Sequence, residues 1–314
     1  MLIVTGGAGF IGSNLIRGLN DMGIDDIIVV DNLKNGVKHR NLNTLRFKDF
    51  VDKETFINNL DMFKSYRIDT IFHQGACTNT LENDGSYMMA NNYDYSKKLL
   101  EFATQTNSSF IYASSASVYG DGANGFVEER RCEYPLNVYA FSKFLFDQYI
   151  RGLLHAVGIQ IVGLRYFNVY GPQEAHKGKM ASVVYHFHNQ ILDDGTIKLF
   201  EGSRGFKRDF IHVDDVVKVN LFFFKNRNRR GIFNCGTGTA RSFYDIAAIM
   251  EKLYKSVRIE FVRFPEELKG KYQAFTKADL SRLREAGYEG GFIPLEKGVT
   301  DYVEILKKTG GFYR

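Results

Sequence analysis

The sequence predicts an α/β fold: a Rossmann-type, doubly wound parallel sheet with a smaller mixed α/β lobe that binds the substrate. Three observations predict it. Short apolar runs alternate with segments of helical periodicity, the first run enters a glycine-rich loop, and the second ends in an acidic residue. Strands that alternate with helices form βαβ units, whose right-handed crossovers build a parallel sheet covered on both faces.

The first half of the chain supplies the expected sheet. Strands are predicted at residues 2–5, 27–31, 69–73, 109–114 and 159–166. Helices are predicted at residues 10–20, 53–66, 87–106 and 136–155. Each strand is short and apolar, as in sheets buried on both faces, and each helical segment is long enough for a crossover.

After Asn168 the alternation becomes irregular. Strands are predicted at residues 197–200, 210–212 and 232–235, and helices at residues 180–192, 242–254, 280–286 and 295–307. We therefore expect residues 1–168 to form the dinucleotide-binding domain, with residues of about 210–240 returning to it. Residues 169–314 are expected to form most of an interleaved substrate-binding lobe.

Composition limits the class of protein. The 314 residues are 44% hydrophobic and 25% charged, which is ordinary for a globular chain with a large core. The three cysteines form no CxxC pair, which favours a reducing cytoplasm and predicts no metal site. No apolar run reaches 18 residues and the first residues have no basic segment, so neither a membrane span nor a signal peptide is expected.

The charge pattern favours a small anionic ligand. The formal net charge is +5, but the basic residues are scattered, and the tightest group, at residues 227–230, is interpreted as a solvated turn. No basic stripe with interleaved aromatic residues is present, so no nucleic-acid partner is expected.

The loop after the first strand is typical of phosphate binding. Gly6, Gly9 and Gly12 give the spacing G-x-x-G-x-x-G between a strand and a helix. Glycines allow a tight turn and a close approach of pyrophosphate, and the helix N-terminus supplies N–H donors and partial positive charge. Placed at this point of the chain, the loop predicts a dinucleotide site.

Asp31 follows the glycines by about 20 residues and ends the second strand. An acidic residue here accepts hydrogen bonds from the adenosine ribose, which favours NAD. Lys34, Lys38 and Lys53 surround it, however, and their cations could hold the 2′-phosphate of NADP. The residues alone leave both cofactors open.

A tyrosine and a lysine form the expected catalytic pair. Tyr139 and Lys143 are spaced i, i+4 and so share one face of a predicted helix. A phenol is too weak a base at neutral pH, and we expect the neighbouring ammonium to lower its pKa. Tyr139 could then exchange the proton of a sugar hydroxyl while hydride passes to or from the cofactor. Ser115 follows the fourth strand and could donate to the reacting oxygen.

The chain resembles an extended short-chain dehydrogenase/reductase that acts on nucleotide sugars, in the NAD-dependent epimerase/dehydratase family. The resemblance covers nearly the whole length. It rests on the glycine loop, the serine string at residues 114–120, the Tyr–Lys pair, and the strings at residues 165–172, 208–215 and 233–238. Strings at residues 31–34, 73–77, 139–147, 176–183, 199–203 and 269–275 point to a subgroup that acts on ADP-bound heptose.

The resemblance implies a cytoplasmic epimerase of ADP-heptose and lipopolysaccharide core biosynthesis. It would invert C6 by transient oxidation and reduction with bound NADP, NAD being the alternative. Two acid/base groups are implied, Tyr139 and Lys177. The resemblance also implies a homo-oligomer, expected to be a pentamer.

The same resemblance assigns the binding residues. The cofactor is expected at Gly6, Gly9, Phe10, Ile11, Gly12, Asp31, Asn32, Lys38, Lys53, Gln74, Gly75, Ala76, Cys77, Thr78, Asn91, Lys143 and Lys177. The substrate is expected at Asn168, Lys179, His186, Phe200, Glu201, Gly202, Ser203, Arg208 and Tyr272.

Two positions depart from the family pattern. Gln173 stands where an arginine is expected after Gly171-Pro172, and Lys179 replaces a small polar residue two positions from Lys177. The second departure leaves open which lysine is the second base.

Three other functions fit the residues less well. A UDP-hexose 4-epimerase is the alternative, disfavoured by Lys177 and by the string at residues 269–273. A 4,6-dehydratase needs an Asp-Glu pair where Ala116 follows Ser115. A non-catalytic dinucleotide sensor would be expected to lack Tyr139 or Lys143.

Overall fold

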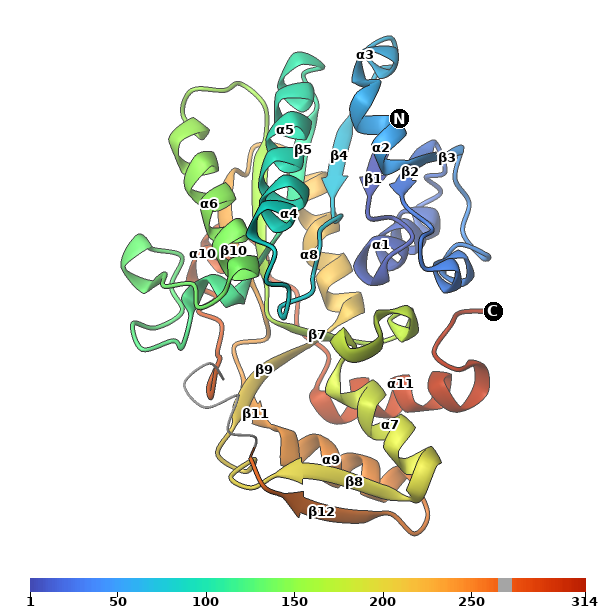
Figure 1. Ribbon diagram of the computed structural model, residues 1–314. Coiled ribbons are helices and arrows are strands. Elements are labelled where there is room, and N and C mark those ends of the chain that lie inside the picture. The colour runs from blue at the N-terminus through green and yellow to red at the C-terminus, as the bar shows by residue number, and fades with distance from the viewer. Residues whose placement is uncertain (265–272) are drawn as a thin grey trace.

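The computed structural model describes residues 1–264 and 273–314. Within these ranges, seven parallel strands form the central sheet, in the order β10-β6-β5-β4-β1-β2-β3 (Figure 1). They are β1 (Leu2–Thr5), β2 (Ile27–Asp31), β3 (Asp49–Asp52), β4 (Thr70–His73), β5 (Ser109–Ser115), β6 (Ile161–Tyr166) and β10 (Gly231–Cys235). The order reverses between β1 and β4, which is where ligands bind in doubly wound sheets. The predicted fold class is confirmed.

Alternate residues of each strand face opposite layers of helices. Leu2 and Val4 of β1 pack in one core cluster with residues of α1 (Phe10–Asp21) and α8 (Val213–Lys225). Ile3, between them, packs in a second cluster with α2 (Lys53–Asn58), α5 (Tyr95–Gln105) and α6 (Val138–Leu153). Both faces are therefore buried, and this explains the uninterrupted apolar strands.

Two predicted helices are interrupted. The segment predicted as one helix at residues 53–66 forms α2 and a short α3 (Leu60–Phe63), separated at Asn59, whose backbone is not helical. The segment predicted at residues 87–106 forms α4 (Gly85–Met89), a π-helical turn η2 (Ala90–Asp94) and α5. Such π turns insert one extra residue and often occur at functional sites.

The remaining elements form a smaller lobe. In the described part of the chain, a mixed sheet has the order β11 (Ala240–Ser242), β9 (Lys207–His212), β7 (Asn168–Tyr170), and a parallel pair joins β12 (Arg258–Val262) to β8 (Thr196–Phe200). Helices α7 (Val183–Asp194), α9 (Phe243–Leu253) and α11 (Leu295–Thr309) pack on these strands in a separate core cluster, and α10 (Ser281–Glu285) packs against the central sheet. Figure 1 shows this lobe beneath the central sheet, with β7 and β9 running between the two.

None of the helices in residues 1–264 and 273–314 is both long enough and apolar enough to span a membrane.

Candidate active site

A cavity of about 500 Å³ opens at the carboxyl ends of β1, β2 and β4. Its size suits a small-molecule or cofactor site. The predicted cofactor residues that line it are Gly6, Gly9, Phe10, Ile11, Gly12, Asp31, Asn32, Lys38, Lys53, Gln74, Gly75, Ala76, Cys77, Thr78, Asn91 and Lys177. Lys143 is the predicted cofactor residue that the lining does not include. Predicted cofactor residues that are spread from Gly6 to Lys177 in the sequence thus line a single cavity.

The glycine loop has no room for side chains at two of its positions. Gly6 has a φ of 66°, and a Cβ there would lie 2.6 Å from the backbone nitrogen of Gly75. A Cβ on Gly12 would lie 2.2 Å from the carbonyl oxygen of Gly6. The loop therefore keeps backbone close to the cavity and leaves the N–H groups at the start of α1 facing the phosphate position, so the residues fit a dinucleotide.

The carboxylate of Asp31 is paired with a lysine. It accepts a hydrogen bond from the backbone N–H of Ala8 at 2.9 Å and forms an ion pair with Lys38. Lys38 also donates to the carbonyl of Asn32 at 2.9 Å. On the neighbouring strand end, Lys53 donates to Asn91 Oδ1 at 2.7 Å. This end of the cavity therefore combines one carboxylate with several ammonium groups.

Helix α6 carries the predicted Tyr–Lys pair at its start. The Asn137 side chain caps the helix by accepting a hydrogen bond from Ala140 N at 2.8 Å. Burial raises the pKa of Tyr139, and a hydrogen bond with Ser115 opposes this rise. The structure therefore does not show the expected lowering by Lys143: burial has the largest effect on the pKa of Tyr139, and the lowering contribution comes from Ser115.

Lys143 is 5% exposed and donates from Nζ to the carbonyl of Ala113 at 2.8 Å. Burial lowers its pKa to about 8, while the Asp147 carboxylate acts in the opposite direction. Cys77, which lines the cavity, lies close enough to influence the pKa of both Tyr139 and Lys143. The pair therefore lies beyond the Cys77 end of the cavity.

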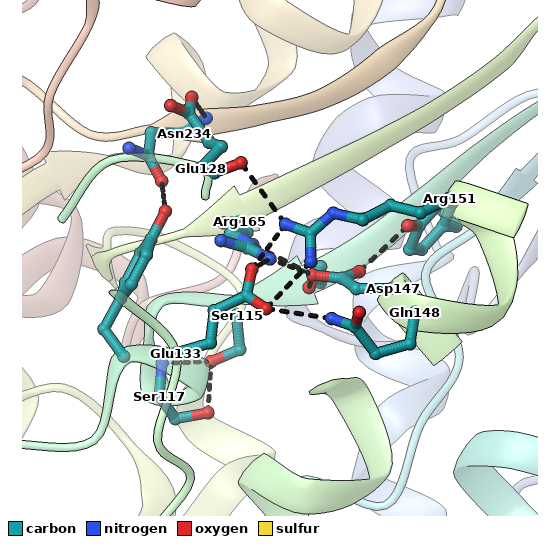
Figure 2. A network of polar contacts seen from close by, with 12 residues as sticks. Ser115, Ser117, Glu128, Glu133, Asp147, Gln148, Arg151, Arg165 and Asn234 are labelled. Carbon is teal, nitrogen blue, oxygen red and sulfur yellow. Dashed lines mark hydrogen bonds and ion pairs between the residues drawn. The ribbon is translucent and has the colours of Figure 1, made fainter. Parts of the chain in front are cut away.

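Ser115 ends β5, and the 3-10 turn η3 (Ala116–Tyr119) follows it. Its hydroxyl oxygen accepts hydrogen bonds from the backbone N–H and the hydroxyl of Ser117, at 3.2 and 2.9 Å (Figure 2). This cap turns the chain and, with the hydrogen bond to Tyr139, fixes the serine beside the phenol.

The two candidate second bases differ in environment. Lys177 lies in the turn η5 (Ala175–Met180), lines the cavity, and holds its ammonium 5.0 Å from the centroid of the Phe10 ring. Burial lowers the pKa of Lys177, partly opposed by Glu174. Lys179 is exposed and follows Gly178, where the backbone reverses with a φ of 54°. Of the two, Lys177 is the one brought to the cavity.

The predicted substrate residues lie in the smaller lobe. Asn168 begins β7, His186 lies on α7, residues 200–203 end and follow β8, and Arg208 is buried in β9. None of these lines the cavity described above. Ser203 is buried, and its hydroxyl has no hydrogen-bond partner among the described residues. Tyr272 lies outside the described residues.

Several lining residues were not predicted. They are Thr5, Val30, Asn35, Asn79, Tyr87, Tyr95, His176 and Met180, while Lys34, named with Lys38 and Lys53 as a possible contact of a 2′-phosphate, also lines the cavity. Most of them are chain neighbours of predicted residues, so sequence adjacency was the available signal. Tyr95 could not be found this way, because it is not adjacent to a predicted residue. It begins α5, directly after the π turn η2.

A buried polar network ties α6 to the sheet behind the Tyr–Lys pair. Asp147 lies one helical turn beyond Lys143. Its carboxylate accepts hydrogen bonds from Tyr112, Ser114 and Arg165, each at 2.9 Å. Because Ser114 precedes Ser115, one carboxylate connects the strand that carries the serine to the helix that carries Tyr139.

Glu133 extends this network, with its carboxylate among Arg165, Arg151 and Gln148 (Figure 2). Its carboxylate forms ion pairs with Arg165 and Arg151 and accepts a hydrogen bond from Gln148 at 2.9 Å. Burial alone would raise the pKa of Glu133, but the two guanidinium groups hold it below its usual value. Sequence reasoning missed these residues, because their partners are distant in the chain.

Comparisons with known proteins agree with this geometry. Residues 2–236 match the model of the NAD dependent epimerase/dehydratase family. The chain is 58% identical to an ADP-L-glycero-D-manno-heptose-6-epimerase from Brachyspira hyodysenteriae, over 99% of each chain. A crystal structure of Helicobacter pylori ADP-L-glycero-D-manno-heptose-6-epimerase is similar with a TM-score of 0.86 and 30% identity, covering 98% of this chain and 96% of that one.

A 4-epimerase is also similar in structure. UDP-glucose 4-epimerase from Thermotoga maritima, solved with UDP-glucose, gives a TM-score of 0.82 and 29% identity, over 98% of this chain and 99% of that one. The family match covers most of the chain, and the glycine loop, Ser115 and the Tyr139–Lys143 pair all fall within it. The chain therefore belongs to the NAD dependent epimerase/dehydratase family.

Proposed function

We propose that this protein epimerises ADP-bound D-glycero-D-manno-heptose at C6, by oxidising and then reducing that carbon. The observation that carries the proposal is the presence of two proton-transferring groups on different elements. Tyr139 lies on α6, and Lys177 lies on η5 with its pKa lowered by burial. Inversion by oxidation and reduction needs one acid/base group for each face of the carbon. The high identity to a heptose 6-epimerase supports the same substrate.

The proposed cofactor is NADP, held by the glycine loop, Asp31 and the lysines around it. Lys38 and Lys53 line the adenosine end of the cavity together with Lys34. Phosphate oxygens accept charge-assisted hydrogen bonds from such ammonium groups, whereas NAD has no phosphate there. When bound, the cofactor would supply the hydride acceptor and donor for C6. NAD is the alternative, because Asp31 is also suited to ribose hydroxyls.

The side chains have separate tasks in this mechanism. Ser115 holds the sugar oxygen at C6, and Tyr139 accepts the proton of that hydroxyl as the carbon is oxidised. Lys143 stabilises the phenolate form that Tyr139 needs before it can accept this proton. After the ketone has turned, Lys177 donates a proton to its oxygen as the opposite face is reduced. In the reverse direction Lys177 must accept a proton, and burial favours this because it lowers the pKa of Lys177.

We also propose a division of labour between the two parts of the chain. Residues 1–168, with about 210–240, would hold the cofactor, and the rest of residues 169–314 would hold the sugar nucleotide. The strand β10 at the edge of the central sheet supports this division.

The decisive experiment is incubation of the purified protein with ADP-D-glycero-D-manno-heptose and NADP, with the C6 epimers resolved by chromatography. We expect an equilibrium mixture, and Tyr139→Phe should lower the rate by roughly 10²–10⁴-fold. Turnover of UDP-glucose without heptose conversion would instead favour the 4-epimerase function of the Thermotoga maritima relative.

A further inference from the structure

Gln173, one of the two departures from the family pattern, lies where three segments meet. Its side chain donates to the carbonyl of Asn41 at 3.2 Å and accepts from the backbone N–H of Tyr313 at 3.4 Å. Its backbone carbonyl accepts from the Asn41 side chain at 3.0 Å, and its N–H donates to Gly311 at 2.8 Å. One residue thus joins the turn η1 (Gly36–Asn41), the segment that leads to Lys177, and the segment after α11.

The backbone of Gln173 is held in an unfavourable conformation. Its φ is 76°, in the left-handed region, and the residue is 1% exposed. A non-glycine residue stays there only if its surroundings determine it, and such positions cluster at functional sites. The four hydrogen bonds of Gln173 supply that constraint.

Asn41 connects the same point to the cofactor cavity. It is fully buried, and its side-chain NH₂ donates to the carbonyl of Ala8 in the glycine loop at 3.0 Å. The same group lies 3.3 Å from Nδ1 of His176, the residue before Lys177. Burial lowers the pKa of His176 to about 4, with Lys38 and Lys177 acting in the same direction and a hydrogen bond with the Gln173 backbone opposing them, so this ring is neutral at pH 7.

The segment after α11 closes over this junction from outside. Figure 1 shows it rising from α11 toward the central-sheet domain. Phe312 is buried beneath the guanidinium of Arg40, 3.8 Å from the ring centroid, and Tyr313 donates from its hydroxyl to Asn14 at 3.2 Å. Both partners belong to elements that adjoin the glycine loop or η1, and neither aromatic residue lines the cavity.

We propose that Asn41 and Gln173 form a clamp that positions Lys177 and η1 about the cofactor, and that residues 312–314 hold this clamp closed. Gln173 and Asn41 are positioning residues, because neither lines the cavity. The part that concerns catalysis rests on the proposed function. The part that concerns cofactor binding does not, because η1 carries Lys38 and the glycine loop carries the phosphate site.

The clamp would act by restricting two segments that otherwise belong to different lobes. Lys38 lies in η1 together with Asn41, and Lys177 lies in η5, shortly after Gln173 in the chain. Both turns are short 3-10 turns. Such turns are weakly stable on their own, so their side chains stay at the cavity only if tertiary contacts fix them. Loosening the clamp should therefore weaken cofactor binding without removing any group that touches the cofactor.

The test compares three proteins with the parent chain. Gln173→Gly removes the side-chain bridge but suits a φ of 76°, so it introduces no backbone strain. Removal of residues 312–314 takes away the covering segment and leaves Gln173 in place. Ser256→Gly is the matched control, because Ser256 also has a positive φ, of 61°, and lies before β12, away from the cavity. NADPH binding is measured by fluorescence titration and folding by thermal unfolding.

We expect Gln173→Gly and the removal of residues 312–314 each to raise the Kd for NADPH by roughly tenfold, as loss of buried hydrogen bonds would. The protein that combines both changes should lose less affinity than the sum of the two single losses, because both changes loosen the same junction. Ser256→Gly should bind as the parent does. This binding measurement needs no sugar substrate, so it tests the clamp independently of the proposed reaction.

Catalysis supplies the second readout. With cofactor at saturation, Gln173→Gly should lower kcat by roughly tenfold through misplacement of Lys177, while Ser256→Gly leaves kcat unchanged. Unchanged NADPH affinity in Gln173→Gly would overturn the clamp, and additive losses in the combined protein would overturn the role of residues 312–314. If NADPH affinity falls as expected but no heptose is converted by the parent chain, the clamp stands and the proposed function fails.

Discussion

The carboxylate of Asp147 accepts a hydrogen bond from the Arg165 guanidinium at 2.9 Å, and neither side chain is exposed to solvent. Asp147 also lies one turn of α6 beyond Lys143, whose pKa it raises against the effect of burial. A single buried charge thus has two roles: it fixes the helix to the sheet, and it keeps a proton on the lysine beside Tyr139.

Asp147→Asn removes the charge of this side chain but keeps its size and shape, so it tests the two roles of the charge. Loss of the charge leaves Arg165 buried with fewer partners, and we expect the free energy of unfolding to fall by about 3–5 kcal/mol. The pKa of Lys143 should fall below its present value of about 8, because the opposing carboxylate is gone. The alkaline limb of the plot of kcat/KM against pH should therefore move to lower pH.

Urea unfolding and a pH–rate profile measure the two effects. Asp193→Asn, at an exposed position on α7, is the control for loss of a carboxylate. An Asp147→Asn protein with reduced stability but an unshifted alkaline limb would show that Asp147 is purely structural.

The two neighbouring lysines give a direct comparison. Lys177→Gln should lower kcat by roughly 10²–10⁴-fold, because Lys177 is at the cavity and is proposed to exchange a proton with the substrate. Lys179→Gln should change kcat by less than about threefold, since Lys179 is exposed. Steady-state kinetics with the heptose substrate measures both, and the reverse ranking would assign the base to Lys179.

Lys38 is expected to decide the cofactor preference. Lys38→Met keeps the aliphatic stem but removes the ammonium that pairs with Asp31. The Kd for NADPH should rise roughly 10- to 100-fold, as for loss of a charge-assisted hydrogen bond, while the Kd for NADH changes much less. Lys48→Met, which removes an exposed lysine at the start of β3, is the control. Equal losses for both cofactors would argue against a 2′-phosphate contact.

His73 should make stability depend on acid pH. Burial, and secondarily Lys143, lowers the pKa of His73 from 6.5 to about 3. Its neutral ring lies in a buried chain, 2.6 Å from Thr5 Oγ1 at Nδ1 and 2.8 Å from Ser96 Oγ at Nε2. Below pH 6.5 the unfolded chain binds a proton here and the folded protein does not, so the free energy of unfolding falls as pH decreases toward 3.

The contribution of His73 should approach ~1.4 kcal/mol per pH unit. Urea unfolding of the parent and of His73→Asn, at pH 7, 5.5 and 4.5, tests this. The variant should start less stable at pH 7 and lose less between pH 7 and 4.5. Parallel slopes would mean that other groups carry the acid sensitivity.

Much of the central sheet could be predicted, because the apolar runs and the residues that end them indicate the same strands. The bounds of β1 and β2 were predicted to the residue, since each apolar strand ends at a glycine or an acid. The helix α8 was not predicted, although its apolar residues recur at helical spacing. The break at Asn59 was missed as well, because a single asparagine gives a weak signal inside a helical pattern.

The candidate site also has a part that could be predicted from the sequence and a part that could not. Residues within short motifs, such as Gly6 and Lys143, could be named from the sequence because a few neighbours determine their surroundings. The contact of Gln173 with Tyr313 joins positions 140 residues apart, and that of Lys53 with Asn91 joins positions 38 apart. Only the folded chain brings such pairs together, and one sequence contains no record of them.

The path of the chain between its sheets has a practical consequence. It leaves the seven-stranded sheet after β6, contributes β7, β8 and β9 below, returns through α8 and β10, and leaves again for β11. No single cut in the gene can therefore separate one sheet from the other. Swapping the sugar-binding portion between relatives would require several splice points, and a chain terminated before β10 would lack strands from the central sheet and from the smaller lobe.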